Sequence, residues 1–391
     1  MTEHFDPYRL QTTAFILTNA MLILPYRIIE RGWLAITDGR IAEIGENNPP
    51  ERGFDCEGDY IMPGLVELHT DHLESHYMPR PKVRWNPFGA VLAYDAQIAS
   101  AGITTVFDSL RVGSDGDSAA LGTELWTLAE ALDQAASGGY LRAEHLTHLR
   151  CEMSAADVME QAEGFIARFK AHLISLMDHT PGQRQFRNLD AWRTYYSRKG
   201  ALTREELDQL MELRLEAHSF YAAKHRRETI ELARRHKIVL ASHDDTTQEH
   251  VAESIADGVA IAEFPTTLAA AEASHAAGIQ VMMGAPNIVR GGSHSGNIAA
   301  EELARLNLLD ILSSDYVPAS MLMAAFELPR RVGAIGLPQA IRSVTKNPAD
   351  AAGLYDRGAI ADDLRADLVR VKMAGNVPVV RQVWREGRTI A

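Results

Sequence analysis

Ionisable side chains end five of the eight short apolar runs in the middle of this chain. They stand where a strand would meet the loop that follows it, and they are His69, Asp71, Glu152, His179, His243 and Asp315. Imidazole nitrogens and carboxylate oxygens together suit Zn²⁺ or a similar divalent ion, and a carboxylate can bridge two ions. An unpaired buried charge is costly, so packing alone does not explain the pattern. The sequence therefore predicts a site for one or two divalent ions, with Zn²⁺ expected and Mn²⁺ or another ion as the alternative.

The predicted chemistry is hydrolysis by a water molecule that such a metal site activates. Residues two apart on a strand face the same side, so we expect His69 and Asp71 to point one way, with Glu67 behind them. Asp315, at the end of the last run, is the candidate general base because a carboxylate there could accept a proton from that water.

Each of these residues also has a structural interpretation. A single histidine at a strand end is more often a hydrogen-bonded structural residue than a ligand. Glu152 could pair with Arg150, and Asp244 and Asp245 beside His243 could cap a loop. The convergence of polar residues on several strand ends, rather than any one of them, favours the metal site.

A second set of candidate residues is basic and follows three of the strand ends. It consists of Arg80, Lys82 and Arg84 in PRPKVRW, Arg184 in HTPGQRQF and Arg290 in APNIVRGGSHSGN. Arginine pairs bidentately with phosphate oxygens, and glycine-rich loops expose backbone N–H groups to an anion. Three such loops above the same face of a barrel would clamp a polyanion. The alternative at each position is an ordinary solvated loop charge.

The order of the apolar runs predicts the elements that position these residues. Eight runs alternate with helical segments between residues 61 and 353, which is the count for a TIM-like (β/α)₈ barrel of the α/β class. The runs are MPGLVELHTD, GITTVFDS, HLTHLRCEM, HLISLMDH, KIVLASHDD, GVAIAEFPTT, IQVMMGAPN and LLDILSSD. Residues 1–60 and 354–391 contain short strands and turns, and we expect them to form one small β-sandwich domain beside the barrel.

One connection is long for a barrel unit. Residues 180–235 separate the fourth run from the fifth, and they contain a capping box in which Glu206 follows Thr203 by three residues. We expect this segment to form either a lid or a contact between copies in a homo-oligomer.

Composition narrows the class of protein. Of 391 residues, 46% are hydrophobic and 23% are charged, which excludes a disordered or collagen-like chain. Two cysteines are too few for a disulfide framework, no apolar run has the length of a transmembrane helix, and residues 1–15 lack the features of a signal peptide. We therefore expect a cytoplasmic protein. The net charge of −13 argues against nucleic acid and anionic membranes as partners, but a local basic cluster can still bind an anionic small molecule.

Motifs along almost the whole chain resemble the amidohydrolase superfamily. PGLVELHTD follows DGRIAEIGE, and GAIADDLRADLV lies near the C-terminus. The longer blocks HTDHLESHYMPRPKVRW, SLMDHTPGQRQF, AEFPTT, MGAPNIVRGGSHSGN and ILSSDYVPAS are similar to one branch, the PhnM-type diphosphatases of the carbon–phosphorus lyase pathway. This resemblance implies water-dependent cleavage of α-D-ribose 1-methylphosphonate 5-triphosphate, a polyanionic sugar triphosphate, to the 5-phosphate and pyrophosphate.

The resemblance also implies ligand roles for His69, Asp71, His243 and Asp315. The chain departs from the superfamily pattern in three places. His-x-Asp stands in place of His-x-His, Glu152 substitutes for a bridging lysine, and His179 serves in place of a histidine on the sixth run. His72 stands where we expect asparagine in this branch, so its role is open.

Two other functions fit parts of the sequence. One is a conventional amidohydrolase that cleaves a C–N bond in a cyclic amide or deaminates a base; such substrates carry little charge, so the basic loops favour a phosphate substrate. The other is an inactive scaffold that kept the fold and lost the metal. The five occupied strand ends favour an active enzyme over that scaffold.

Overall fold

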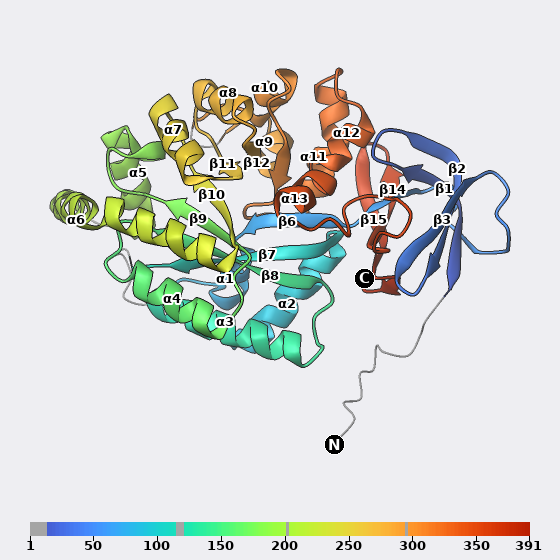
Figure 1. Ribbon diagram of the computed structural model, residues 1–391, viewed down its shortest axis with the longest axis horizontal. Helices are drawn as coiled ribbons and strands as arrows, with labels where there is room; N and C mark the ends of the chain where they lie inside the picture. The colour runs from blue at the N-terminus through green and yellow to red at the C-terminus, as the bar shows by residue number, and fades with distance from the viewer. Residues whose placement is uncertain (1–13, 115–120, 201–202, 294–295) are drawn as a thin grey trace.

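The computed structural model describes residues 14–114, 121–200, 203–293 and 296–391. Within those ranges a parallel barrel is flanked on one side by a mixed sheet (Figure 1). Residues 1–13 lie outside the described ranges, and they make up most of the segment 1–15 in which the sequence lacks the features of a signal peptide. Among the described residues, no helix is both long enough and apolar enough to span a membrane.

All eight apolar runs form strands of one parallel sheet, and the strands follow one another around the barrel in sequence order. They are β6 (Leu65–Thr70), β7 (Ile103–Val112), β8 (Glu144–Glu152), β9 (Leu173–Met177), β10 (Val239–His243), β11 (Ile261–Glu263), β12 (Gln280–Gly284) and β13 (Ile311–Ser313). A parallel bridge between Thr70 and Asp315 brings the first and last strands together. Leu68, Phe107 and Ile261 belong to the apolar cluster that fills the interior. The predicted (β/α)₈ fold is therefore confirmed.

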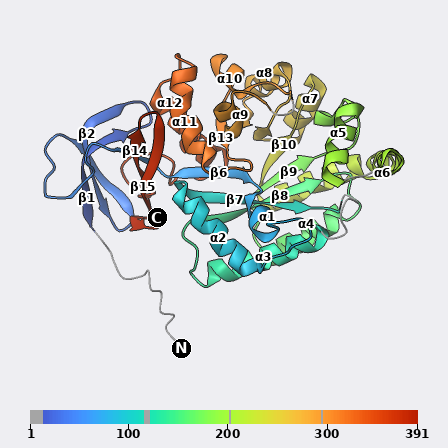
Figure 2. The ribbon, with the colours of Figure 1, turned by 180° about the vertical axis from the view of Figure 1, so that it is seen from behind.

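Helices cover the outside of the barrel, as Figures 1 and 2 show from opposite sides. In chain order they are α1 (His72–Tyr77), α2 (Pro87–Ser100), α3 (Leu121–Ser137), α4 (Val158–Arg168), α5 (Leu189–Gly200), α6 (Arg204–His236), α7 (Gln248–Asp257), α8 (Leu268–Ala276), α9 (Ala285–Arg290), α10 (Ala300–Arg305), α11 (Ser320–Arg331), α12 (Leu337–Arg342) and α13 (Lys346–Ala351). Thr247 caps α7 and Thr267 caps α8, each by accepting a backbone N–H. These caps end the loops after β10 and β11, and both loops border the site.

The long connection between β9 and β10 is helical. It contains the 3₁₀ turn η1 (Arg184–Phe186), α5 and the 33-residue α6. The predicted capping box is present, since Thr203 accepts a hydrogen bond from Glu206 N and the Glu206 carboxylate accepts one from Thr203 N at 2.7 Å. A separate apolar cluster, which includes Trp192 and Met211, packs α5 against α6.

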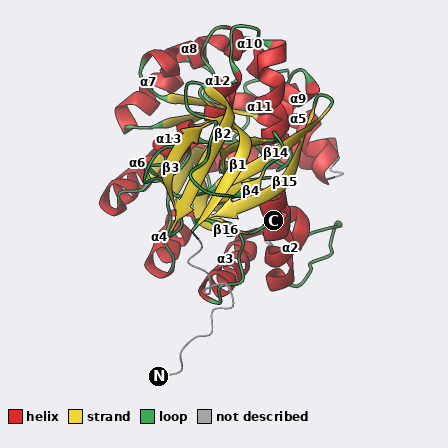
Figure 3. Ribbon diagram, turned by 90° about the vertical axis from the view of Figure 1, so that its right-hand side faces the viewer, coloured by secondary structure: helices red, strands yellow, loops and turns green. Residues whose placement is uncertain are grey.

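The strands at the two ends of the chain join in one mixed sheet (Figure 3). Its strands are β1 (Phe15–Ile23), β2 (Ile28–Thr37), β3 (Arg40–Glu46), β4 (Phe54–Asp55), β5 (Tyr60–Pro63), β14 (Leu368–Ala374), β15 (Val377–Arg385) and β16 (Arg388–Thr389). Their order is β16-β15-β14-β5-β1-β2-β3, with β4 paired to β1. β1 and β15 are not neighbours in this order, yet Phe15 of β1 stacks on Trp384 of β15, with ring centroids 6.5 Å apart. The sheet therefore folds over a core of its own. The exact domain limits, 1–60 with 354–391 against 61–353, stay a prediction.

Candidate active site and metal centre

A cavity of about 290 Å³ lies at the carboxyl ends of the barrel strands. The predicted ligands that line it are His69, Asp71, His179, His243 and Asp315. Glu152, the remaining predicted ligand, is buried and in contact with His179. The tertiary structure thus brings together residues that are up to 246 positions apart in the sequence of 391.

Glu263, the last residue of β11, lies between two of the predicted histidine ligands. His243 Nδ1 is 2.9 Å from Glu263 Oε2, and His69 Nδ1 is 3.1 Å from Glu263 Oε1. Burial would raise the pKa of Glu263, but the imidazoles of His69 and His148 hold it well below its ordinary value. The Glu263 carboxylate is therefore ionised at neutral pH, and it contacts both rings through their Nδ1 atoms.

Ser175 and His148 extend this network into the barrel. Ser175 Oγ donates to Glu263 Oε2 at 2.6 Å, and His148 Nε2 lies 2.5 Å from Ser175 Oγ. Burial lowers the pKa of His148 to about 3, although the charge of Glu263 opposes that effect. The His148 ring is therefore neutral at pH 7 and retains one nitrogen that can accept a proton or bind a metal.

His179 is held by Glu152, which ends β8. Glu152 accepts a hydrogen bond from His179 N at 3.0 Å, and His179 Nδ1 lies 2.6 Å from its second carboxylate oxygen. Burial alone would raise the pKa of Glu152, but the charge and hydrogen bonds of His179 lower it to about 2. Arg150, the other partner considered for Glu152, pairs instead with Asp71 at 3.3 Å.

Two groups of side chains in the described part of the chain could each hold a metal ion. They are His69, His148 and Glu263, and His179, His243 and Asp244; within each group the ligand atoms lie within 4.8 Å of one another. His69 Nδ1 and Glu263 Oε1 are buried 3.1 Å apart. A buried set of imidazole and carboxylate donors held this close together fits a divalent ion.

Asp315, the candidate general base, follows β13 and lines the cavity. Burial raises its pKa; His69 opposes this shift and Asp71 adds to it. A raised pKa suits a carboxylate that must take up a proton near neutral pH.

Three residues at the cavity have backbone conformations in the left-handed region. The φ angle is 55° at Asp315, 58° at Asp244 and 55° at Phe264. Such conformations are unfavourable for bulky residues and concentrate at functional sites.

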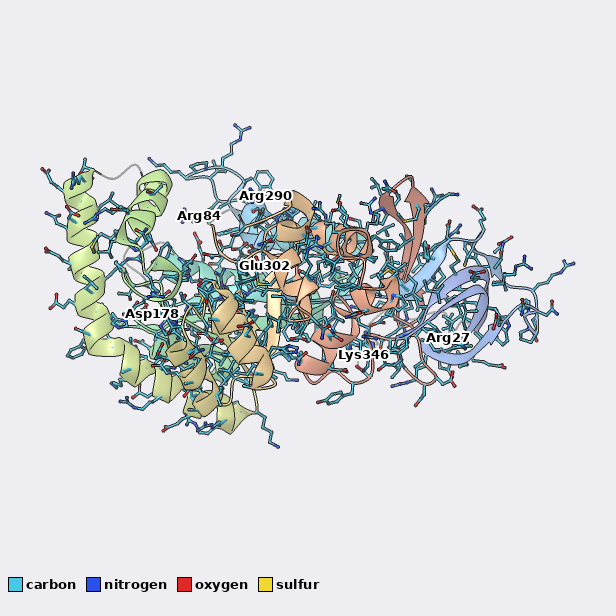
Figure 4. All side chains as sticks on the ribbon, turned by 90° about the horizontal axis from the view of Figure 1, so that it is seen from above. Arg27, Arg84, Asp178, Arg290, Glu302 and Lys346 are labelled. Carbon is cyan, nitrogen blue, oxygen red and sulfur yellow. The ribbon has the colours of Figure 1, made fainter. Side chains whose placement is uncertain are left out.

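The predicted phosphate-binding residues do not all lie at the cavity wall. Arg290, which ends α9, lines the cavity. An exposed segment after α1 carries Arg80, Lys82 and Arg84, and Arg84 pairs with Glu124 at 2.6 Å (Arg84 and Arg290 are labelled in Figure 4). Their binding of phosphate stays a prediction.

Arg184 is 5% exposed and is engaged with the protein itself. It is hydrogen-bonded to the Asp245 carboxylate and donates to the backbone oxygen of His243 at 3.3 Å, so it supports the end of β10. Arg111 and Arg150, which the sequence does not predict as phosphate ligands, line the cavity together with Arg290. Arg111 lies on β7 and Arg150 lies on β8.

Glu67 does not lie behind His69 in the way that strand alternation predicts. β6 has a register irregularity between Glu67 and Thr70, so the alternation does not continue through it. The Glu67 carboxylate accepts hydrogen bonds from His69 N at 2.7 Å and from Ser314 N at 2.6 Å. Burial raises its pKa to about 8. Glu67 therefore ties β6 to the end of β13 beneath the cavity-lining residues.

Glu263 and His148 are the ligand candidates that the strand-end pattern did not identify. Glu263 ends β11 but lies inside the sixth run, GVAIAEFPTT, so the criterion finds it only when the strand end is placed before Phe264. His148 lies inside its run and has no comparable signal. His72, whose role was open, has its Nε2 3.1 Å from Gln97 Oε1.

The barrel, its flanking sheet and the polar strand ends define an amidohydrolase-type fold. No family model matches the chain. Among solved structures, an amidohydrolase aligns with a TM-score of 0.64 at 15% identity, covering 96% of this chain and 98% of the other. The N-acetyl-D-glucosamine-6-phosphate deacetylase of Mycobacterium smegmatis aligns with a TM-score of 0.63 at 15% identity, covering 96% of this chain and all of the other. At such identities the likeness concerns the fold alone.

Sequence similarity is far more specific. A protein of Escherichia coli (strain K12) named alpha-D-ribose 1-methylphosphonate 5-triphosphate diphosphatase is 45% identical over 378 residues, which are 96% of this chain and 100% of that protein. An imidazolonepropionase of Klebsiella pneumoniae matches over only 48 residues, 12% of each chain. This chain belongs to the family of alpha-D-ribose 1-methylphosphonate 5-triphosphate diphosphatases.

Proposed function

We propose that this chain hydrolyses α-D-ribose 1-methylphosphonate 5-triphosphate to the 5-phosphate and pyrophosphate, in phosphonate catabolism. The observation that carries this proposal is the 45% identity to the E. coli diphosphatase along that protein's whole length. In the reaction, the oxygen of water bonds to the phosphorus nearest the ribose. The bond from that phosphorus to the bridging oxygen breaks, and its electron pair leaves with pyrophosphate.

The proposed metal is Zn²⁺, with Mn²⁺ or another divalent ion as the alternative. Its proposed ligands are His69, Asp71, Glu152, His179, His243 and Asp315, with His148, Asp244 and Glu263 as further candidates. The mixture of imidazole and carboxylate donors supports zinc, and the two ligand groups support up to two ions. When bound, such an ion supplies Lewis acidity, which lowers the pKa of water and offsets phosphate charge.

The remaining roles belong to the chain's own side chains. Asp315 is the proposed general base, because it lines the cavity and burial raises its pKa. Arg111, Arg150 and Arg290 are proposed to hold the triphosphate and to stabilise charge on the leaving pyrophosphate, since all three line the same cavity. Arg80, Lys82, Arg84 and Arg184 are also proposed to bind the triphosphate, and together with these three arginines they form what is here called the clamp.

The charge distribution supports a small polyanion as the partner. The net charge of −13 disfavours nucleic acid and anionic membranes. Inside the cavity, Arg111, Arg150 and Arg290 offer guanidinium groups to an anion, and bound divalent ions would offset the charges of the aspartates that line it with them. We propose a cytoplasmic location, because a chain with only two cysteines suits a reducing compartment.

A product assay tests the proposed function against its rivals. Purified protein is incubated with the sugar triphosphate, and separately with a cyclic amide and an aminopyrimidine, while pyrophosphate, phosphate and ammonia are measured. We expect pyrophosphate release from the triphosphate, its loss on chelation and its return with Zn²⁺ or Mn²⁺. Ring opening or ammonia release without pyrophosphate would favour a C–N hydrolase. Protein that binds no metal and is inactive on all three substrates would favour the scaffold.

A further inference from the structure

The outward side of α6 carries a line of exposed residues that is interrupted only by the half-buried Ala217. The helix packs inward through residues such as Leu207, Met211 and Ala222. At spacings of three and four residues on the opposite side stand Glu206, Gln209, Leu213, Ala217, Phe220, Lys224 and Arg227, here called the outer stripe. Leu213 is 64% exposed and Phe220 is 74% exposed. Figure 4 shows the first part of α6 along the left-hand edge of the molecule, at the end remote from the mixed sheet, before the helix turns along the lower edge.

The outer stripe has an internal two-fold pattern. Its midpoint falls between Glu216 and Ala217. Successive pairs outward from that point are Leu213 with Phe220, Gln209 with Lys224, and Glu206 with Arg227. The stripe is therefore acidic at one end, apolar in the middle and basic at the other end. A surface that pairs with itself about a two-fold axis needs this kind of order, because residue i contacts j of the other copy and j contacts i.

We infer that the outer stripe docks on the same stripe of a second copy of this chain, with the two α6 helices antiparallel. Phe220 of each copy then packs against Leu213 of the other, which removes four large apolar side chains from water. Glu206 of each copy faces Arg227 of the other. Parallel helices would instead set Glu206 against Glu206 and Arg227 against Arg227, so charge selects the antiparallel arrangement. The contact involves only one helix of each copy, and so small an interface gives a dimer that dissociates on dilution.

Disulfide trapping tests the geometry of this dimer. The double variant Leu213→Cys/Phe220→Cys should form disulfide-linked dimers under mild oxidation. Its two thiols are about two helical turns apart on one helix, which is too far for a bridge within a chain. The native Cys56 and Cys151 are buried, so they do not contribute. Denaturing electrophoresis without reductant measures the yield, and circular dichroism shows whether the variant is folded.

A matched control has the same spacing away from the outer stripe. Glu212→Cys/Ser219→Cys places two thiols at exposed positions on another side of α6. We expect linked dimers from the stripe variant and monomers from the control. Equal yields from the two variants, or no linked dimer from a folded stripe variant, would overturn the proposal.

Charge substitutions at Gln209 provide a second test that leaves the capping box of α6 intact. In the antiparallel dimer Gln209 of each copy faces Lys224 of the other, so the two-fold axis gives this contact two times. Gln209→Glu should lower the dimer dissociation constant, and Gln209→Lys should raise it, each by about 2- to 30-fold at low salt. The double variant Gln209→Lys/Lys224→Glu should return it towards wild type.

Sedimentation velocity over a dilution series measures these dissociation constants. Phe220→Ser should leave the protein monomeric at concentrations where wild type is dimeric. A wild-type protein that is monomeric throughout, or a dimer that neither Gln209 variant nor Phe220→Ser alters, would contradict the α6 contact. The diphosphatase assay is independent of this result, so the proposed function stands or fails separately.

Discussion

His243 and Glu263, which are paired neighbours at the ends of β10 and β11, are joined by a contact of 2.9 Å between imidazole Nδ1 and carboxylate Oε2. The second oxygen of the same carboxylate lies 3.1 Å from His69 Nδ1. A carboxylate on Nδ1 sets the tautomer and orientation of a ligand imidazole and raises its basicity. A glutamate on the sixth strand can therefore contribute to the metal centre at the place where the superfamily pattern has a histidine.

Glu263→Gln should weaken metal binding more than it weakens the fold. The amide keeps the size of the side chain but loses the negative charge that His69 and His243 share, so we expect metal affinity to fall by about 10- to 100-fold. Metal titration monitored by competition with a chelating dye measures this, and excess Zn²⁺ should restore part of the activity. Ser175→Ala serves as a control for loss of a hydrogen bond to Glu263 without loss of charge. An unchanged affinity in Glu263→Gln would remove Glu263 from the metal centre.

Asp315→Asn should slow the reaction more than it weakens substrate binding. The amide cannot accept a proton, and a general base typically contributes about 10²- to 10⁴-fold in rate. We expect kcat to fall within that range while KM changes little, with metal content measured on the same sample. His243→Ala is the comparison, because there metal content and activity should fall together. Turnover by Asp315→Asn within a few-fold of wild type would refute the assignment.

Arg290→Ala and Arg184→Ala should differ in kind. Arg290 lines the cavity, so its loss should reduce kcat/KM for the triphosphate by about 10- to 150-fold, and much less for a monoanionic ester. Arg184 is buried against Asp245, so its loss also leaves a buried carboxylate unpaired. We expect Arg184→Ala to lower the free energy of unfolding by about 3–5 kcal/mol, in addition to any loss of triphosphate turnover. Equal losses on all substrates for Arg290→Ala would exclude it from the clamp.

His145 should make stability depend on pH above neutrality. Its Nδ1 lies 2.9 Å from Asp108 Oδ2 and its Nε2 lies 3.3 Å from Asp95 Oδ1. Burial would lower its pKa, but the two carboxylates raise it to about 9, above the ordinary value of 6.5. The stabilisation is therefore complete below pH 6.5 and lost as the pH rises through about 9, and it is on the order of 3 kcal/mol.

Urea unfolding of wild type and His145→Gln across this pH window provides the measurement. The wild-type free energy of unfolding should fall between pH 6.5 and pH 9 by more than that of the variant. Parallel curves for the two proteins would show that His145 carries no charge in the folded state.

Much of the site was predictable because its signals are local in the sequence. Each barrel strand is a short apolar run, and the carboxyl end of a parallel strand in such a barrel faces the site, so the residue that ends a run is placed by chain direction alone. His69, His179 and His243 are found in this way, and all three line the cavity. The capping box at Thr203 and Glu206 is equally local, since it depends on residues three apart.

Tertiary structure decided which of these groups contact one another. His148 and Ser175 meet Glu263 only because β8, β9 and β11 curve around the same interior, and no spacing in the sequence encodes that meeting. Arg184 and Arg290 have similar sequence surroundings, yet one pairs with a buried carboxylate and the other lines the cavity. The direction of a long side chain depends on the partners that packing supplies, and those partners come from distant parts of the chain.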